Sequence, residues 1–277
     1  MNLLHQRVQQ QYYQQNLYQN ILNALTAKDL DLQQLHWQDL KAVDEFHVGG
    51  LEATKALAAA AKLQADTHLL DVGCGIGGAA RFLAAQYHCK VVGVDLLPEY
   101  ILTAQLLTQQ VGLADQIQYF VADALALPFA NETFHVVWTQ HVQMNIADKP
   151  AFYQELARVL QKDGRLLYYD VFKNTDTDLH FPLPWANNQQ TSFLISQNEL
   201  KNYLHAAHLV QIATFDFTAQ GISSLNQVLN RIAKQGIPDL SLQLLMGDTF
   251  TIKLENLLHH LQENNLVLEA GIYQKMV

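Results

Sequence analysis

The chain has 277 residues, of which 49% are hydrophobic, and its formal net charge at pH 7 is −9. This length is enough for a large buried core, either as one α/β domain with additions or as two small domains. The acidic balance lacks the basic footprint of nucleic-acid-binding proteins, so we expect no nucleic-acid partner, and no apolar run reaches the roughly 20 residues of a membrane span, so we expect no stable membrane insertion.

The first 45 residues are rich in glutamine, yet apolar side chains recur at helical spacing from Leu17 to Leu25. Glutamine is a fair helix former, so this stretch predicts one or two amphipathic helices rather than a disordered tract. We treat residues 1–48 as an N-terminal helical cap. Two roles are open for it: a packing appendage, or a lid over an active site.

From about residue 51 the pattern alternates between helices and short apolar strands. The predicted helices are 51–63, 77–87, 98–113 and 149–164, and the predicted strands are 68–73, 90–97, 117–124, 134–141 and 165–172. Pro98 marks the start of one helix and Gly164 the end of another. Nearly all-apolar strands separated by helices indicate a parallel sheet covered on both faces, that is, a doubly wound α/β fold.

After Phe172 the rhythm changes. A loop with two prolines is followed by a helix that begins after Ser196, with Glu199 at the capping-box spacing. The remaining predicted elements are a strand at 211–218, helices at about 222–235 and 250–263, and a closing strand at 265–277. We assign residues 49–277 to one domain, with a helical insertion at about 222–263.

The stretch LLDVGCGIGGAAR (69–81) is a glycine-rich loop between a strand and a helix. Gly73, Gly75 and Gly78 satisfy the G-x-G-x-x-G spacing of a dinucleotide fingerprint, so an NAD or FAD enzyme is one candidate. In a doubly wound sheet the ligand lies beyond the carboxyl ends of the strands, and glycine lets it approach the backbone. Adenosyl ligands use such a loop as well as dinucleotides.

Acidic residues at three successive strand ends indicate which of these two ligand classes, dinucleotides or adenosyl ligands, the loop binds. Asp71 would repel a pyrophosphate but could accept from the α-ammonium of S-adenosylmethionine (SAM). Asp95 ends the second strand and can bind ribose hydroxyls, and Asp123 ends the third and suits the adenine amine. Each one alone could be a helix N-cap or turn residue. Together they favour SAM over NAD.

The chain resembles a class I SAM-dependent methyltransferase over roughly residues 45–215. The resemblance rests on LLDVGCGIGG, VVGVDLLPEYI, FVADALALPF, FHVVWTQHV and LARVLQKDGRLLYYDVF, which match that superfamily's motifs in order and spacing. Within it, the chain is similar to the small-molecule branch of ubiquinone/menaquinone, tocopherol, glycine/sarcosine and phosphoethanolamine methyltransferases. The resemblance implies a seven-stranded sheet with an antiparallel last strand, SAM as cofactor, S-adenosylhomocysteine (SAH) as product and a small-molecule acceptor such as an amine, phenol or quinone-like ring. The alternative is a catalytically silent SAM-binding or scaffold protein.

The resemblance also assigns cofactor residues. It implies that the methionine end of SAM contacts Asp71, Gly73, Cys74, Gly75 and Gly77 of the loop. The ribose and one face of the adenine would then contact Asp95 and Leu96, and the adenine edge would contact Asp123 and Ala124. The backbone of Gln140, after the fourth strand, would lie near the carboxypropyl chain. Cys74 is interpreted as a small loop residue rather than a nucleophile.

The acceptor side is implied less directly. Related families close over SAM with the region of DEFHVGG (44–50), which makes His47 and Gly49 candidates for the substrate or the methionine carboxylate. Aligned through Asp148-Lys149, the histidine of the tocopherol and phosphoethanolamine enzymes falls on Asn145, and their acidic residue falls on His141. We predict His141 as general base or substrate anchor, sharing a face with Asn145 if the stretch is helical.

Phe181 and Trp185, in the proline-rich loop after the fifth strand, offer apolar or cation-binding surface for the acceptor. The insertion at 222–263 is expected to shape the acceptor pocket or to make an oligomer contact, such as that of a homodimer. The 12 histidines are scattered, so no metal site is predicted. With two cysteines and an N-terminus unlike a signal peptide, a reducing cytoplasm is the expected compartment.

Overall fold

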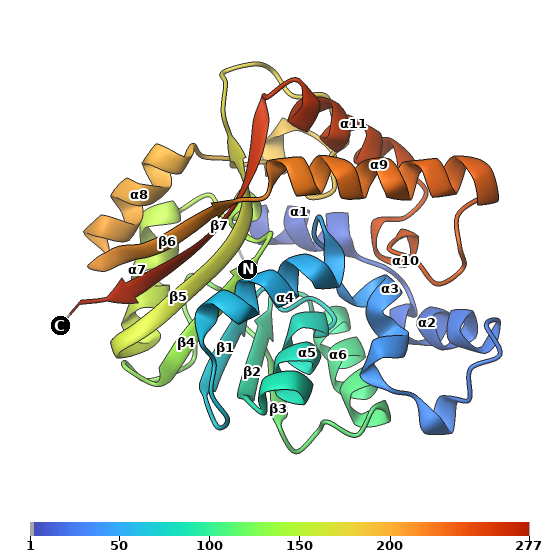
Figure 1. Cartoon of the computed structure of the whole chain (residues 1–277), viewed down its shortest axis with the longest axis horizontal. Helices are drawn as coiled ribbons and strands as arrows, with labels where there is room; N and C mark the ends of the chain where they lie inside the picture. The colour runs from blue at the N-terminus through green and yellow to red at the C-terminus, as the bar shows by residue number, and fades with distance from the viewer. Residues whose placement is uncertain (1–2, 277) are drawn as a thin grey trace.

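The computed structural model describes residues 3–276, so the last position of the predicted closing strand, Val277, lies outside the described residues. One seven-stranded sheet runs through the molecule, with strand order β3-β2-β1-β4-β5-β7-β6 (Figure 1). The strands are β1 (His68–Val72), β2 (Lys90–Asp95), β3 (Ile117–Val121), β4 (Phe134–Gln140), β5 (Leu160–Lys173), β6 (Leu209–Asp216) and β7 (Leu266–Lys275). The predicted α/β class is therefore confirmed.

Strand direction follows the expected scheme. β1 pairs in parallel with β2 on one side and β4 on the other, and β3 and β5 extend the parallel part outwards. β7 is antiparallel to both neighbours, β5 and β6, which confirms the antiparallel last strand. Strand order reverses between β1 and β4, and ligands of open α/β sheets bind at such a switch point.

Helices cover both faces of the sheet because its strands are apolar on both sides. Leu69 packs in the cluster on one face and the next residue, Leu70, in the cluster on the other. The first face holds α4 (Gly50–Ala61), α5 (Gly78–Tyr87), α6 (Pro98–Gln110), α9 (Thr218–Gln235) and α11 (Phe250–Gln262). The second holds α7 (Lys149–Val159) and α8 (Gln197–Ala206), seen at the left of Figure 1.

The N-terminal residues are helical, as their glutamine-rich pattern predicts. The elements are α1 (Leu3–Tyr12), α2 (Leu17–Thr26), the 3-10 turns η1 (Leu32–Gln34) and η2 (Trp37–Leu40), and α3 (Lys41–Asp44). In α2 the apolar stripe of Leu17, Ile21 and Leu25 is fully buried. It packs against α6, where Leu107 belongs to the same cluster.

The junction between α7 and β5 lies earlier in the chain than the sequence predicts. The helix expected to stop at Gly164 ends at Val159, because Leu160 turns to extended backbone and pairs with Phe134 of β4. Gly164 instead lies inside β5, where an added Cβ would sit 2.8 Å from the carbonyl oxygen of Gln161. The predicted capping box on α8 is present in both directions between Ser196 and Glu199.

The insertion before β7 contains one helix more than predicted, α10 (Gln243–Met246), between α9 and α11. Short 3-10 turns also occur at η3 (Gln143–Asn145) and η4 (Gln189–Thr191). Of the helices that the structure describes, none combines the length and apolar character needed to cross a bilayer.

Candidate functional site

The glycine-rich loop needs its glycines for two different physical reasons. The amides of Gly73 and Cys74 both donate to the carbonyl of Val94, at 2.8 and 3.0 Å, which fixes the loop to the end of β2. Gly73 has φ +72°, and a Cβ there would lie 2.3 Å from Val142 Cγ2. Gly75 has φ +55°, but a Cβ there would meet no atom within 4 Å. Gly73 therefore serves packing, whereas Gly75 leaves open space for a ligand.

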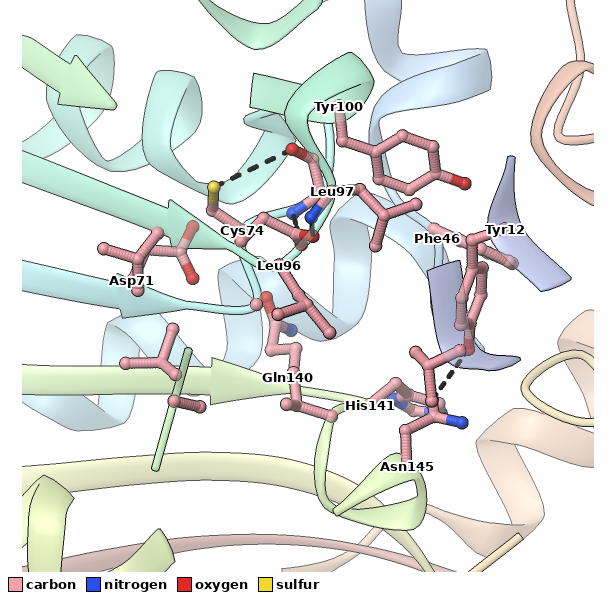
Figure 2. Close-up of a pocket in the computed structure, with 18 of the residues that line it drawn as sticks. Tyr12, Phe46, Asp71, Cys74, Leu96, Leu97, Tyr100, Gln140, His141 and Asn145 are labelled. Carbon is pink, nitrogen blue, oxygen red and sulfur yellow. Dashed lines mark hydrogen bonds between the residues drawn. The ribbon is translucent and has the colours of Figure 1, made fainter. Parts of the chain in front are cut away.

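The carboxyl ends of β1, β2 and β4 open onto a cavity of about 330 Å³, within the range of small-molecule sites. Figure 2 shows the loop residues Asp71 and Cys74 on one side of it and Tyr12, Phe46 and Asn145 on the other. The sequence-predicted residues that line it are His47, Asp71, Gly73, Cys74, Gly75, Asp95, Leu96, Asp123, Ala124, Gln140, His141 and Asn145.

Asp71 is a buried carboxyl, 3% exposed, and its Oδ2 atom has no hydrogen-bond partner among the described residues. Burial, with the nearby charges of Glu45 and Asp95, raises the pKa of Asp71 to about 8. A buried acceptor that no protein group satisfies is rare in folded proteins. Asp71 therefore presents an unused acceptor to a cationic donor inside the cavity.

Asp95 and Asp123 are held by backbone amides rather than by cations. Asp95 accepts from the amides of Gly75 and Leu97, both at 3.0 Å. Asp123 accepts from the amide of Leu125 at 2.9 Å, and its other oxygen lies 3.4 Å from His5 Nε2 of α1. A carboxylate oxygen can accept more than one bond, so both side chains keep acceptor capacity for a ligand.

His141 has the least satisfied side chain at the cavity. Both of its ring nitrogens are buried without a partner, and its φ of 53° is left-handed, a conformation that costs a non-glycine residue about 1–2 kcal/mol. Its ring packs edge-on against Tyr169, with centroids 4.8 Å apart, and lies 5.8 Å from His47. Burial, with a smaller contribution from His47, lowers the pKa of His141 well below its usual value. The ring is therefore neutral at pH 7 and has a free lone pair.

His47 lines the same cavity but has no free nitrogen. Its Nε2 lies 2.7 Å from Glu45 Oε2 and its Nδ1 lies 3.2 Å from the carbonyl oxygen of Val48. Thr54 donates to the same Glu45 oxygen at 2.8 Å. These bonds hold the segment between α3 and α4 against the cavity wall. Of the two histidines, only His141 can exchange a proton through an unoccupied nitrogen.

Lys149, which is 3% exposed, fixes the loop after β4 through hydrogen bonds to backbone carbonyls. Its ammonium donates to the carbonyls of Gln143 and Phe193, at 2.7 and 2.6 Å, and also to the carbonyl of Ile146. Burial lowers the pKa of Lys149 to about 7. Asp148 caps α7 by accepting from the amide of Ala151 at 3.0 Å. The Asp-Lys pair thus shapes the loop that carries His141.

Asn145 connects this loop to the N-terminal helix. Its Oδ1 accepts from the Tyr12 hydroxyl at 2.7 Å (Figure 2), and its Nδ2 donates to the carbonyls of Trp185 and Thr191, at 2.9 and 3.2 Å. His141 and Asn145 do not share a helix, because only a 3-10 turn forms at 143–145. The amide of Asn145 is engaged at both ends and ties three segments together.

α1 crosses the cavity between these contacts. Besides Tyr12, its Gln9 side chain donates to the carbonyl of Leu96 at 3.0 Å, and His5 faces Asp123 at the far end. Val8 and Tyr12 line the cavity directly. The N-terminal residues therefore cover the strand ends, which is the placement expected of a lid.

Four predicted site residues do not line the cavity. An added Cβ at Gly77 would lie 2.3 Å from the Tyr119 hydroxyl, and Gly49 is the N-cap of α4 with φ +82°. Trp185 is 2% exposed and donates to Ser192 Oγ at 3.0 Å, and Phe181 is partly buried against the core cluster of the first face. The proline-containing loop buries these rings against the core, so the expected acceptor surface is not formed by them.

Several cavity residues have no role predicted from the sequence. Val8, Tyr12, Phe46, Tyr100 and Leu245 come from α1, the segment before α4, α6 and α10. Each reaches the cavity through tertiary packing. Tyr12 lies 133 residues from its partner Asn145 in the chain. Asp44, Glu45 and Phe46 lie inside DEFHVGG beside the predicted His47, and Tyr100 lies inside VVGVDLLPEYI.

Comparisons with known proteins agree with this geometry. Residues 70–168 match the family model described as a methyltransferase domain. The chain is 30% identical over 136 residues to methyltransferase GfsG of Streptomyces halstedii, covering 49% of each chain. It is 33% identical over 129 residues to phosphoethanolamine N-methyltransferase 1 of Arabidopsis thaliana, covering 47% of this chain and 26% of that one. The chain thus spans half or less of the length of these curated relatives.

Among solved structures, the chain is similar to geranyl diphosphate C-methyltransferase from Streptomyces coelicolor A3(2), a complex that contains SAH. The TM-score is 0.72 at 15% identity, with 99% of each chain covered. A likeness at this identity speaks for the fold. The family match runs from β1 into β5, so residues 70–168, which carry the glycine loop and the acids at the switch point, match a methyltransferase domain.

Proposed function

We propose that this protein transfers the methyl group of SAM to a small-molecule acceptor and releases SAH. The observation that carries the proposal is the unpartnered, buried Oδ2 of Asp71 in a cavity that Asp95 and Asp123 also line. When bound, SAM supplies a methyl group already activated on a sulfonium. The protein then has to bind SAM, hold the acceptor in line with that methyl group, and take a proton where the acceptor carries one.

The residues present fit such a cofactor. Asp71 offers its free oxygen to the α-ammonium, and Gly75 leaves the loop open beside it. Asp95 retains acceptor capacity for the two ribose hydroxyls, and Asp123 for the adenine amine. Leu96 and Ala124, with Leu97 and Leu125, supply apolar walls on either side of the position expected for the ring. α1 and residues 44–47 close the cavity as a cap.

His141 is the general base in this proposal. It is neutral because of its burial, and each ring nitrogen lacks a partner, so one can accept a proton from an acceptor placed against it. The ring of Tyr169 packs edge-on against the imidazole of His141 at a centroid distance of 4.8 Å. Asn145 has a positioning role here, because its amide already bonds Tyr12 and the 185–191 loop.

Calorimetric titration of SAM, SAH and NAD into the purified protein tests the cofactor. We expect SAM and SAH to bind and NAD not to bind, and Asp95→Ala to abolish SAH binding, since this carboxylate would hold the ribose. NAD binding without SAH binding would refute the methyltransferase proposal. SAH binding without methyl transfer to a panel of amines, phenols and quinols would indicate the silent SAM-binding alternative.

Asp71 gives a second expected result, which needs no acceptor. With a pKa of about 8, the Asp71 carboxyl holds a proton at pH 7 in the unliganded protein. An ammonium favours the ionised form, so SAH binding at pH 7 should release roughly one proton. The measurement is the SAH binding enthalpy in buffers of differing ionisation enthalpy. Asp71→Asn should bind more weakly and release none; an equal release from this variant would exclude Asp71 as the source.

A further inference from the structure

The cavity contains unsatisfied polar atoms that the cofactor does not account for. The buried cavity atoms without partners are Asp71 Oδ2, both ring nitrogens of His141 and the Tyr100 hydroxyl. Asp71 is assigned to the SAM ammonium. The remaining two side chains come from different elements, α6 and the end of β4, and face one cavity. Since buried polar groups are normally bonded, each indicates a place for a ligand atom.

Tyr100 is the residue without a role so far. It lies in the first turn of α6, is 3% exposed, and its ring meets Tyr12 at a centroid distance of 6.4 Å and an angle of 68°. Figure 2 shows its hydroxyl pointing towards the side of the cavity where Tyr12 and Phe46 lie. Burial raises the pKa of Tyr100 well above its usual value, so the group is a neutral hydroxyl that can donate.

The lining of the cavity restricts the charge of what can bind beside these groups. Its apolar part includes Val8, Phe46, Leu97, Ile146 and Leu245. Its acidic members are Asp44, Glu45, Asp71, Asp95, Asp123 and Asp148, and no lysine or arginine is among the described lining residues. In a low-dielectric cavity, a phosphate or carboxylate on the acceptor would meet like charges and lose its hydration.

We propose that the acceptor is an uncharged, largely apolar molecule that carries a hydroxyl group, and that Tyr100 is a specificity-determining residue whose hydroxyl binds an oxygen of that acceptor. The inference rests on the proposed methyl transfer. In that reaction the proton of the reacting hydroxyl goes to a ring nitrogen of His141, and the oxygen lone pair forms the new O–CH3 bond. The electrons of the broken C–S bond stay on sulfur, which leaves neutral SAH.

The test compares two probes with the same apolar body and different charge, 4-butylphenol and 4-butylphenyl phosphate. Each is titrated calorimetrically into the full chain saturated with SAH. We expect the phenol to bind at least about tenfold more tightly than the phosphate, because the phosphate brings a desolvated charge next to carboxylates. Tyr100→Phe should weaken phenol binding by roughly 2- to 10-fold, the range for one lost hydrogen bond.

The variant separates a binding role from a structural one. Tyr100→Phe removes an unpartnered buried hydroxyl, so the melting temperature should stay the same or rise. The matched control is Tyr13→Phe, which removes the hydroxyl of a side chain that is 62% exposed and should leave phenol binding unchanged.

Three results would overturn the proposal: equal or tighter binding of the phosphate, no detectable binding of the phenol, or phenol binding that Tyr100→Phe leaves intact. All three are read in the presence of bound SAH, so they are distinguishable from failure of the methyltransferase proposal, which would appear as an absence of SAH binding.

Discussion

Replacing His141 by alanine should lower kcat/KM for the acceptor by about 10²- to 10⁴-fold, the usual contribution of a positioned general base. The dissociation constant for SAH should not change, because the cofactor is expected to bind at Asp71, Asp95 and Asp123 rather than at this ring. The matched control is His205→Ala, which removes an exposed histidine of α8 far from the cavity lining. A rate loss shared by both variants would contradict a specific role.

The pH profile provides the sharper readout. Burial places the pKa of His141 below its ordinary value of 6.5, so the imidazole is neutral and competent at pH 7. At saturating SAM, kcat/KM for the acceptor should fall only as the pH drops below 6.5, when the ring takes up a proton and can accept no other. His141→Ala should lose this acidic limb. An identical profile in the variant would exclude the base role.

Breaking the buried ion pair behind the glycine loop should produce the largest loss of stability. Arg81 of α5 is fully buried, and it contacts both carboxylate oxygens of Asp44, with Nη2–Oδ1 at 2.5 Å and Nε–Oδ2 at 3.3 Å. Burial acts to lower the pKa of Arg81, but Asp44 outweighs it and raises that pKa. Arg81→Met would leave the Asp44 carboxylate buried without a partner, which typically costs about 3–5 kcal/mol.

Urea unfolding at pH 7 measures this difference. The double variant Asp44→Leu/Arg81→Met should recover much of the loss, because replacing both charges by apolar groups removes the uncompensated one. Lys55→Met is the control: its pair with Glu52 is exposed, and it should cost at most about 1 kcal/mol. A double variant as unstable as Arg81→Met alone would show that the loss arises from packing and not from the unpaired charge.

The Asp44–Arg81 pair also connects the helix after the glycine loop to the N-terminal segment. Arg81 follows the glycine loop in α5, and Asp44 directly precedes Glu45, which holds His47 at the cavity wall. An added Cβ at Gly78 would lie 2.3 Å from the carbonyl oxygen of Asp44. The third glycine of the apparent dinucleotide fingerprint therefore makes room for the N-terminal segment.

The sequence predicted those parts of the site that sit at strand ends. Asp71 is the next-to-last residue of β1, Asp95 ends β2 and Asp123 lies just after β3. Parallel strands bring their carboxyl ends to one edge. Local pattern and topology together were enough to place them. The same reasoning placed His141 at the cavity, because it immediately follows β4.

Prediction from the sequence was wrong where contacts between distant residues override the local preference for helix, strand or loop. Residues 160–164 read as the end of a helix, but Leu160 gains a strand partner in Phe134. Trp185 is predicted to form a binding surface because its ring can hold apolar or cationic groups, yet it is 2% exposed in the core. Tyr12 and Tyr100 could not be assigned from their neighbours, because their role depends on α1 and α6 meeting across the cavity.

The position of β7 has a consequence for how the chain is made. This strand follows both β5 and β6 in the chain, yet it lies between them and bonds to both. Until residues 266–275 have emerged, β5 and β6 each have an unpaired edge, and unpaired edges of apolar strands invite association with other chains. During translation this half of the sheet therefore stays open until β7 has emerged, and the two unpaired strand edges are exposed to aggregation until the sheet closes.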